Sequence, residues 1–204
     1  MDMVTELKEG DREKVAALLK NLPDYLNALS IIEGNTAGRV FVDDAIAPKT
    51  VVVWECKNGI FLAGNGDNDH FNMAFAEFLE KTLIPRMNEK GQFMNYLMHT
   101  SSWDGKVECI LNGRQLNYDS RRLYSLENRD MNCEKTTLSQ DYELAWVDKN
   151  IVNSHMANAD KVKEELDTVW KERTLFFEKA GGYCAIKDDC IAGWCLFELS
   201  LIHI

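Results

Sequence analysis

The sequence contains no long apolar run, and its N-terminus lacks the apolar region of a secretory signal. Every apolar run is far shorter than the roughly 20 residues that a membrane-spanning helix needs. Residues 1–14 are rich in charge, whereas an export signal places an apolar stretch behind a short basic one. The sequence therefore predicts a cytoplasmic protein with no membrane partner.

Basic residues are also too few for a general nucleic-acid binder. The chain has 33 acidic and 23 basic residues among 204, for a formal net charge of −10. A protein that binds nucleic acid needs a basic face for phosphate contacts, so we expect no nucleic-acid partner. Hydrophobic residues make up 46% and charged residues 27%, which is typical of a folded globular protein of one large or two small domains.

The cysteines and histidines do not occur at the spacing of a metal site. None of the six cysteines forms a CxxC pair, and the four histidines are scattered singly. We therefore expect no metal centre. Without an export signal, buried reduced thiols are favoured over disulfides. A thiol-dependent enzyme acting through Cys184 or Cys190 is disfavoured, because neither has a histidine nearby in sequence.

Hydrophobic spacing and turn residues predict an alternation of helices and strands in the first 126 residues. Asn58-Gly59 is a strong hairpin signal, and Asp69 is suited to cap the helix that follows it. We expect that helix to carry an aromatic stripe into the core and to be kinked or shortened at Pro85. The predicted helices are 12–22, 24–32, 70–90 and 103–111, and the predicted strands are 39–42, 50–56, 60–63, 93–98 and 121–126.

Residues 127–140 are the most polar stretch and the best candidate linker. Beyond them we expect a strand at 142–147, helices at 149–156 and 160–179, and a hairpin of strands 183–186 and 190–199. The sequence thus predicts an α+β fold of mixed sheets flanked by helices. Its domains are residues 1–130, a linker at 131–140, and residues 141–204.

The residues of both halves resemble the GNAT superfamily of acyltransferases. More closely, the chain resembles the bacterial two-domain GNAT acetyltransferase family that includes the zwittermicin-resistance acetyltransferase, over about residues 10–199. The resemblance is carried by Ile32-Glu33-Gly34-Asn35, Gly38 to Asp44, Pro48-Lys49-Thr50, Phe61 to Gly64, Trp170, Phe177-Glu178-Lys179 and Gly182-Tyr183-Cys184.

This resemblance implies an N-acetyltransferase that moves an acetyl group from acetyl-CoA to the amine of a small molecule. The N-terminal domain is implied to be a degenerate GNAT-like unit, and the C-terminal domain to bind acetyl-CoA. Such enzymes hold the cofactor against a splayed strand. They bind its pyrophosphate with a glycine-rich R/Q-x-x-G-x-G/A loop at a helix N-terminus, where free N–H groups and the helix dipole favour an anion.

No R/Q-x-x-G-x-G/A pattern occurs in the 204 residues. Gly64-Asn65-Gly66 precedes a predicted helix but has neither a third glycine nor a basic partner in sequence. The motif would be expected after Leu199, so we expect a truncated, inactive form with no secure cofactor-binding residue and an incomplete C-terminal domain. Glu198 is a weak candidate for catalysis, and Trp194 is a weak candidate for substrate binding.

A second interpretation is a non-catalytic binding or regulatory protein that retains a degenerate GNAT-like fold. The apolar strand 190–199 lies at the end of its predicted hairpin with no further strand to cover it. Uncovered apolar edges promote pairing with other chains, so self-association through this strand is also expected.

Overall fold

The structure is a computed structural model that describes residues 4–22, 25–56, 59–89, 94, 96–114, 117 and 138–197. The chain divides into two compact units, Met1–Asp119 and Ser120–Ile204. Each contains a sheet flanked by helices, which confirms the predicted α+β class. Most of the predicted linker and the whole predicted strand 121–126 lie outside the described residues, so the domain assignment stays a prediction.

The N-terminal unit contains a five-stranded sheet of order β1-β2-β3-β4-β5. Strands β1 to β4 pair antiparallel, and β5 pairs parallel with β4. The three central strands match the predicted ones within two residues at either end. The bounds are β1 (Thr5–Glu6), β2 (Gly38–Val42), β3 (Thr50–Glu55), β4 (Gly59–Gly64) and β5 (Tyr96–His99).

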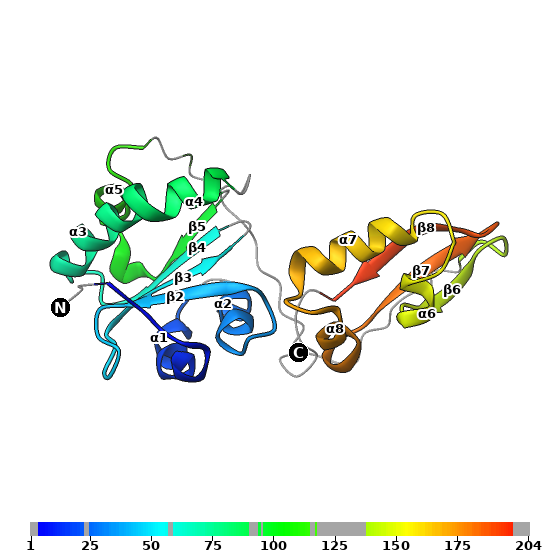
Figure 1. Cartoon of the computed structure of the whole chain (residues 1–204), viewed down its shortest axis with the longest axis horizontal. Coiled ribbons are helices and arrows are strands. Elements are labelled where there is room, and N and C mark those ends of the chain that lie inside the picture. Colours follow the sequence, from blue (N-terminus) through cyan, green and yellow to red (C-terminus); the bar gives the residue numbers. More distant parts are fainter. Residues whose placement is uncertain are drawn as a thin grey trace. The chain divides into compact units, whose positions relative to one another are not determined.

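Both faces of this sheet are covered, which explains the uninterrupted apolar run of β3. Val51 and Val53 face η1 (Glu9–Val15), α1 (Ala16–Leu19) and α2 (Tyr25–Ile32). Val52 and Trp54 face the opposite layer, because successive strand residues point to opposite sides. That layer contains α3 (Asp69–Phe78), α4 (Ile84–Glu89), η3 (Ser101–Trp103) and α5 (Val107–Ile110) (Figure 1).

The predicted helix 70–90 is divided near Pro85. The five-residue π-helix η2 (Leu79–Leu83) joins α3 to α4, and the Ile84 N–H donates to the Leu79 carbonyl. Proline has no N–H and its ring crowds the preceding turn, so the widened turn just before Pro85 has a direct cause. The stripe Phe71, Phe75, Leu79 and Leu83 is buried in the core, as predicted.

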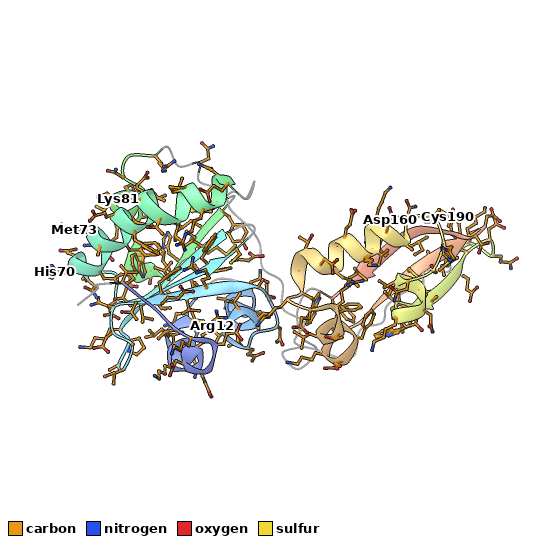
Figure 2. The ribbon with its side chains drawn as sticks, in the orientation of Figure 1. Arg12, His70, Met73, Lys81, Asp160 and Cys190 are labelled. Carbon is orange, nitrogen blue, oxygen red and sulfur yellow. The ribbon has the colours of Figure 1, made fainter. Side chains whose placement is uncertain are left out.

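A buried arginine supports the end of α2. The Arg12 guanidinium, 6% exposed, donates to the carbonyl oxygens of Ile31 at 3.2 Å and Gly38 at 2.9 Å (Figure 2). A cation at a helix C-terminus is favoured by the helix dipole. Gly34 follows with φ +76°, the left-handed conformation in which glycine commonly ends a helix.

The C-terminal unit contains the antiparallel sheet β6-β7-β8. Strands β7 (Gly182–Lys187) and β8 (Cys190–Leu196) form the predicted hairpin. Asp188 and Asp189, between them, both have positive φ, as a two-residue hairpin turn requires. The other elements are β6 (Glu143–Trp146), α6 (Lys149–Val152), α7 (Ala159–Val169) and α8 (Arg173–Lys179).

The predicted helix 160–179 was wrong as a single helix. It ends at Val169, because Trp170 adopts an extended conformation, and α8 begins at Arg173. The break leaves Trp170 buried and in edge contact with Phe176, with ring centroids 5.9 Å apart. Asn158, in the left-handed conformation, precedes α7, and Asp160 lies in the first turn of the helix.

One face of the C-terminal sheet packs on its helices, and the other carries exposed apolar side chains. Cys184 and Ile191 belong to the core with α7 and α8. Leu144, Trp146 and Tyr183 are 60%, 45% and 47% exposed. Among the described residues, no helix combines the length and the apolar character needed to cross a membrane.

Candidate functional site

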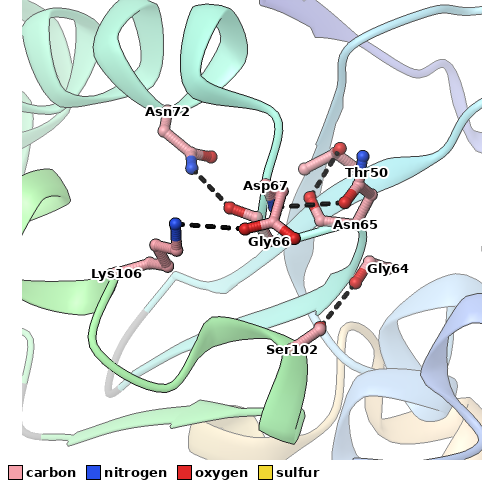
Figure 3. Close-up of polar contacts among 8 residues, drawn as sticks. All are labelled: Thr50, Gly64, Asn65, Gly66, Asp67, Asn72, Ser102 and Lys106. Atoms are coloured by element: carbon pink, nitrogen blue, oxygen red, sulfur yellow. Dashed lines mark hydrogen bonds and ion pairs between the residues drawn. The ribbon is translucent and has the colours of Figure 1, made fainter.

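The candidate site of the N-terminal unit lies where β4 ends and α3 begins. Strand β4 leads through residues 65–68 into α3, and the chain returns as β5, parallel to β4. This connection places the N-terminus of a ten-residue helix directly behind a glycine-containing loop (Figure 3). Such a position is suited to binding an anion when its N–H groups are available.

Asn68 fixes the start of α3. Its side-chain oxygen accepts a hydrogen bond from the Phe71 N–H at 3.3 Å. Its amide nitrogen donates to the Asp43 carboxylate at 2.9 Å and the Thr50 hydroxyl at 3.1 Å. The predicted cap, Asp69, was therefore wrong by one residue, because the Asn68 amide can both accept the cap hydrogen bond and donate to Asp43, just after β2, and to Thr50 of β3.

The two glycines of the loop allow the chain to pack against itself. Gly64 has φ +79°, and a Cβ on it would collide with the carbonyl oxygen of Lys49. A Cβ on the buried Gly66 would collide with the carbonyl oxygen of Ser102. Asn72 holds the same loop by donating to the Gly66 carbonyl at 2.8 Å (Figure 3). Glycine commonly occurs where a backbone must come close to another group, and at both positions that group is a backbone carbonyl of this chain.

The charge at this end of α3 is acidic. Asp67 forms an ion pair with Lys106 at 3.0 Å, and this contact raises the pKa of the Lys106 ammonium above its ordinary value. Asp69 lies in the first turn of α3 and raises the same pKa further. Asp43 contributes a third carboxylate through its contact with Asn68. Carboxylates near a helix N-terminus interact favourably with the helix dipole, so these side chains already supply the negative charge that a bound anion would bring.

Strand β4 is paired along both edges. It pairs with β3 from Glu55↔Gly59 to Thr50↔Gly64, and with β5 from Gly59↔Tyr96 to Leu62↔His99. The contact continues beyond β5, where the Thr100 N–H donates to Leu62 at 3.1 Å. The Ser102 hydroxyl then donates to the Gly64 carbonyl at 2.7 Å (Figure 3). The two parallel strands are thus paired from Gly59 to Leu62, and two further hydrogen bonds hold the chain after β5 against the end of β4.

In the C-terminal unit, β8 lies at the edge of the three-stranded sheet. Its first residue forms an isolated bridge with Ala157, and the Ile191 N–H donates to Ala157 at 2.9 Å. Trp194 packs against the core, and its indole N–H donates to the Glu165 carboxylate at 2.6 Å. Glu198 and Leu199 lie outside the described residues, so the candidate roles of Glu198 and Trp194 stay predictions.

A shallow hollow of about 410 Å³ lies on the helical layer of the same unit. Two cations, Lys149 and Arg173, and one carboxylate, Glu172, lie at its wall beside Val152, Asn153, Thr174 and Phe177. The Lys149 ammonium lies 5.8 Å from the ring centre of Phe177. The excess of positive charge disfavours a cationic amine in this hollow.

The thiols are less uniformly buried than predicted. Cys184 is buried, whereas Cys109 and Cys195 are exposed. Burial raises the pKa of the Cys184 thiol, with a smaller contribution from the Asp148 carboxylate. A raised pKa lowers the thiolate fraction near neutral pH and therefore the reactivity of this cysteine.

Comparison with known proteins identifies the class to which this fold belongs. The family model described as GNAT acetyltransferase matches residues 17–197. The chain belongs to this acetyltransferase family. No curated protein matches the chain.

A solved structure shares the architecture. The GCN5-related N-acetyltransferase-like protein from Streptococcus suis 89/1591 aligns with a TM-score of 0.54 and 14% identity, over 94% of this chain and 71% of its own. At this identity the likeness shows a common fold. The α+β fold class and the GNAT acetyltransferase family expected from the sequence are thus confirmed.

The residues at the β4–α3 junction do not fit the pyrophosphate of acetyl-CoA. The Asn65 N–H donates to the Lys49 carbonyl at 2.7 Å, and the Asp67 N–H donates to the Asn65 side chain at 3.1 Å. Gly66 is covered by Ser102, and the nearby carboxylates would repel a second anion. Ser102 and Lys106 could not be recognised from the sequence, because their contacts with the loop join residues far apart in the chain.

Proposed function

We propose that the protein acts as an N-acetyltransferase that moves an acetyl group from acetyl-CoA to the amine of a small molecule in the cytoplasm. The observation that carries the proposal is the GNAT acetyltransferase match over residues 17–197, which extends through both units. The order of secondary-structure elements supports it. In both units a strand is followed by helices and then by an antiparallel hairpin.

The two units have different roles in this proposal. Residues 1–130 form a GNAT-like domain that does not bind the cofactor, residues 131–140 form a linker, and residues 141–204 form part of the acetyl-CoA-binding domain. Support comes from the sheet edges, because β4 is paired on both sides, whereas β8 ends its sheet in the described part of the unit and has no strand along its outer edge there beyond the bridge of Cys190 to Ala157. An unpaired edge offers N–H and C=O groups to an extended ligand.

Trp194 and Glu198 are the residues of this chain that we propose to act on the acceptor. Glu198 would accept the proton of the amine as it attacks the thioester, and Trp194 would contact the acceptor. In an acetyl-transfer assay of the whole protein, Glu198→Gln should lower kcat, and Trp194→Phe should mainly raise KM. A change of Glu198 that leaves the pH profile and kcat intact would exclude it as the base.

The 204 residues by themselves are proposed to be inactive. The supporting observations are that they contain no R/Q-x-x-G-x-G/A pattern and that the loop 64–69 does not fit pyrophosphate. Isothermal titration of residues 1–204 with acetyl-CoA should show no binding in the micromolar range. Micromolar binding would contradict this part of the proposal. A coding sequence that continues in frame into such a pattern would support it.

The second candidate function is a non-catalytic binding or regulatory protein. The closed loop of the N-terminal unit favours it, because one of the two units lacks an accessible anion site. Acetyl-CoA turnover by the whole protein separates the two functions. Self-association through the edge of β8 is proposed for either one, and size-exclusion chromatography with light scattering tests it, since a monomer at all concentrations would contradict it.

A further inference from the structure

We infer that the N-terminal unit is permanently closed to CoA by its own chain, although it has the strand–loop–helix–strand connection of an acetyltransferase. The inference rests on the proposed function, because it concerns the same cofactor. It goes further by naming the groups that close the site and by distinguishing permanent closure from a gate that opens.

The first barrier is the pairing of β4. An extended ligand that lies along a strand needs unpaired N–H and C=O groups on one edge. Strand β3 takes one edge of β4 and strand β5 takes the other. Beyond β5, Thr100 and Ser102 continue the contact to the carbonyl groups of Leu62 and Gly64. The amide groups of a pantetheine chain therefore find no partner along β4.

The second barrier is the loop. Its N–H groups at Asn65 and Asp67 donate within the chain, and Gly66 is buried beneath Ser102. The first turn of α3 is capped by Asn68 through the Phe71 N–H. Three N–H groups of this junction, those of Asn65, Asp67 and Phe71, therefore already have acceptors within the chain, and the carboxylates of Asp67 and Asp69 would repel a pyrophosphate.

The third observation shows why this closure does not open as a gate. Trp103 follows Ser102 directly and is fully buried in the core formed by α3, α4 and the sheet. Val107, at the start of α5, is buried in the same core. Lifting Ser102 from Gly66 would draw the adjoining indole out of this core. Segments that open at low free-energy cost have few buried apolar contacts, whereas this segment has two buried apolar side chains, Trp103 and Val107.

Amide hydrogen exchange and chemical shifts of the isotopically labelled chain test the inference. The Asn65 and Thr100 amides should exchange as slowly as the central amides of β3, since they become free only when the unit unfolds. Adding millimolar CoA, and separately inorganic pyrophosphate, should leave the amide shifts of residues 60–70 unchanged. Saturable shifts there, or fast exchange at Asn65 and Thr100, would overturn permanent closure.

A matched pair of variants tests the role of Ser102. Ser102→Ala removes the hydroxyl that bonds both the Gly64 carbonyl and the Thr100 hydroxyl, and it should speed exchange at Thr100 by about five- to thirtyfold, the effect of one to two ordinary hydrogen bonds. Ser101→Ala is the control, because Ser101 is exposed and its side chain makes no hydrogen bond within the part of the chain that the structure describes, so exchange should stay the same. Equal effects of the two variants would contradict the assigned role.

The position of any shifts separates the two proposals. Shifts confined to β8 would support both the closure of the N-terminal unit and the acetyltransferase function. Shifts in residues 60–70 would overturn closure while leaving acetyl-CoA use intact. Absence of turnover by the whole protein would overturn the proposed function without affecting the exchange result.

Discussion

The side-chain amide of Asn68 donates to the carboxylate of Asp43 over 2.9 Å, which ties the start of α3 to the end of β2. Asp43 in turn accepts from the N–H groups of Lys49 and Thr50 at 3.0 and 3.1 Å. The Asp43 carboxylate and the Asn68 amide thereby join the end of β2, the start of β3 and the start of α3. The contact determines where the loop 64–69 lies.

Replacing Asn68 should therefore destabilise the N-terminal unit. Asn68→Ala removes the cap and should lower the free energy of unfolding by about 1 kcal/mol. Asn68→Ser keeps a cap acceptor and should cost less, whereas Asn68→Asp places a second carboxylate against Asp43. Urea denaturation measures the three variants, and equal losses for alanine and serine would contradict the capping role.

Gly66 should tolerate no side chain. In Gly66→Ala the new methyl group meets the Ser102 carbonyl, a backbone atom that cannot rotate away, so we expect a loss of about 1–3 kcal/mol in unfolding free energy. Gly10→Ala is the matched control, because nothing lies within 4 Å of its Cβ position. Thermal or urea unfolding should show a clear loss for Gly66→Ala and little change for Gly10→Ala.

Trp103 should matter for its volume rather than for its N–H group. The indole is fully buried, and its nitrogen has no hydrogen-bond partner among the described residues. Trp103→Ala should lower the free energy of unfolding by about 3–5 kcal/mol through the cavity it leaves. Trp103→Phe should cost clearly less. If the two variants were equally destabilised in denaturant titrations, the packing explanation would be wrong.

The cysteines should differ in reactivity as the pH changes. Burial raises the pKa of Cys184, so its thiolate appears at higher pH than that of an ordinary cysteine. Cys195 is exposed and should react with iodoacetamide well before Cys184 near neutral pH. Mass spectrometry of the alkylated peptides between pH 7 and about 9 checks the order. Faster labelling of Cys184 would contradict its burial.

The Glu6–Arg39 pair should contribute stability that is lost in acid. The bond from Arg39 holds the pKa of Glu6 below its ordinary value, about 4.3 when unfolded. The contribution is therefore complete above that value and disappears as pH falls through the lower, folded pKa. Because both side chains are partly exposed, it should amount to only about 0.5 kcal/mol. In Glu6→Gln, the free energy of unfolding should fall less steeply as the pH is lowered through the acidic range. An unchanged pH dependence would contradict a stabilising Glu6–Arg39 pair.

The elements of this fold were largely predictable because their signals are local. The apolar runs within 50–63, the turn at Asp188-Asp189 and the stripe from Phe71 to Leu83 each involve neighbouring residues, and the structure confirms the elements they predicted. The break at Trp170 was missed, because it depends on packing against Phe176 rather than on a helix-breaking residue.

The candidate site was less predictable, because its contacts join residues that lie far apart in the sequence. Gly64-Asn65-Gly66 could be noticed in the sequence, but Ser102 and Lys106 approach it from the far end of β5. Ser102 and Lys106 are separated from the loop by more than 30 residues, so no helix or strand periodicity connects them with it. Whether a glycine faces a ligand or another part of the chain depends on such contacts, and only the folded structure shows them.

The three apolar clusters are divided between the units, and this division has a thermodynamic consequence. Two of them sandwich the five-stranded sheet, whereas one supports the three-stranded sheet, and each draws its residues from a single unit. Heat absorption on unfolding follows the surface that becomes exposed. A calorimetric scan should therefore contain a smaller and a larger transition, with the smaller belonging to residues 138–197.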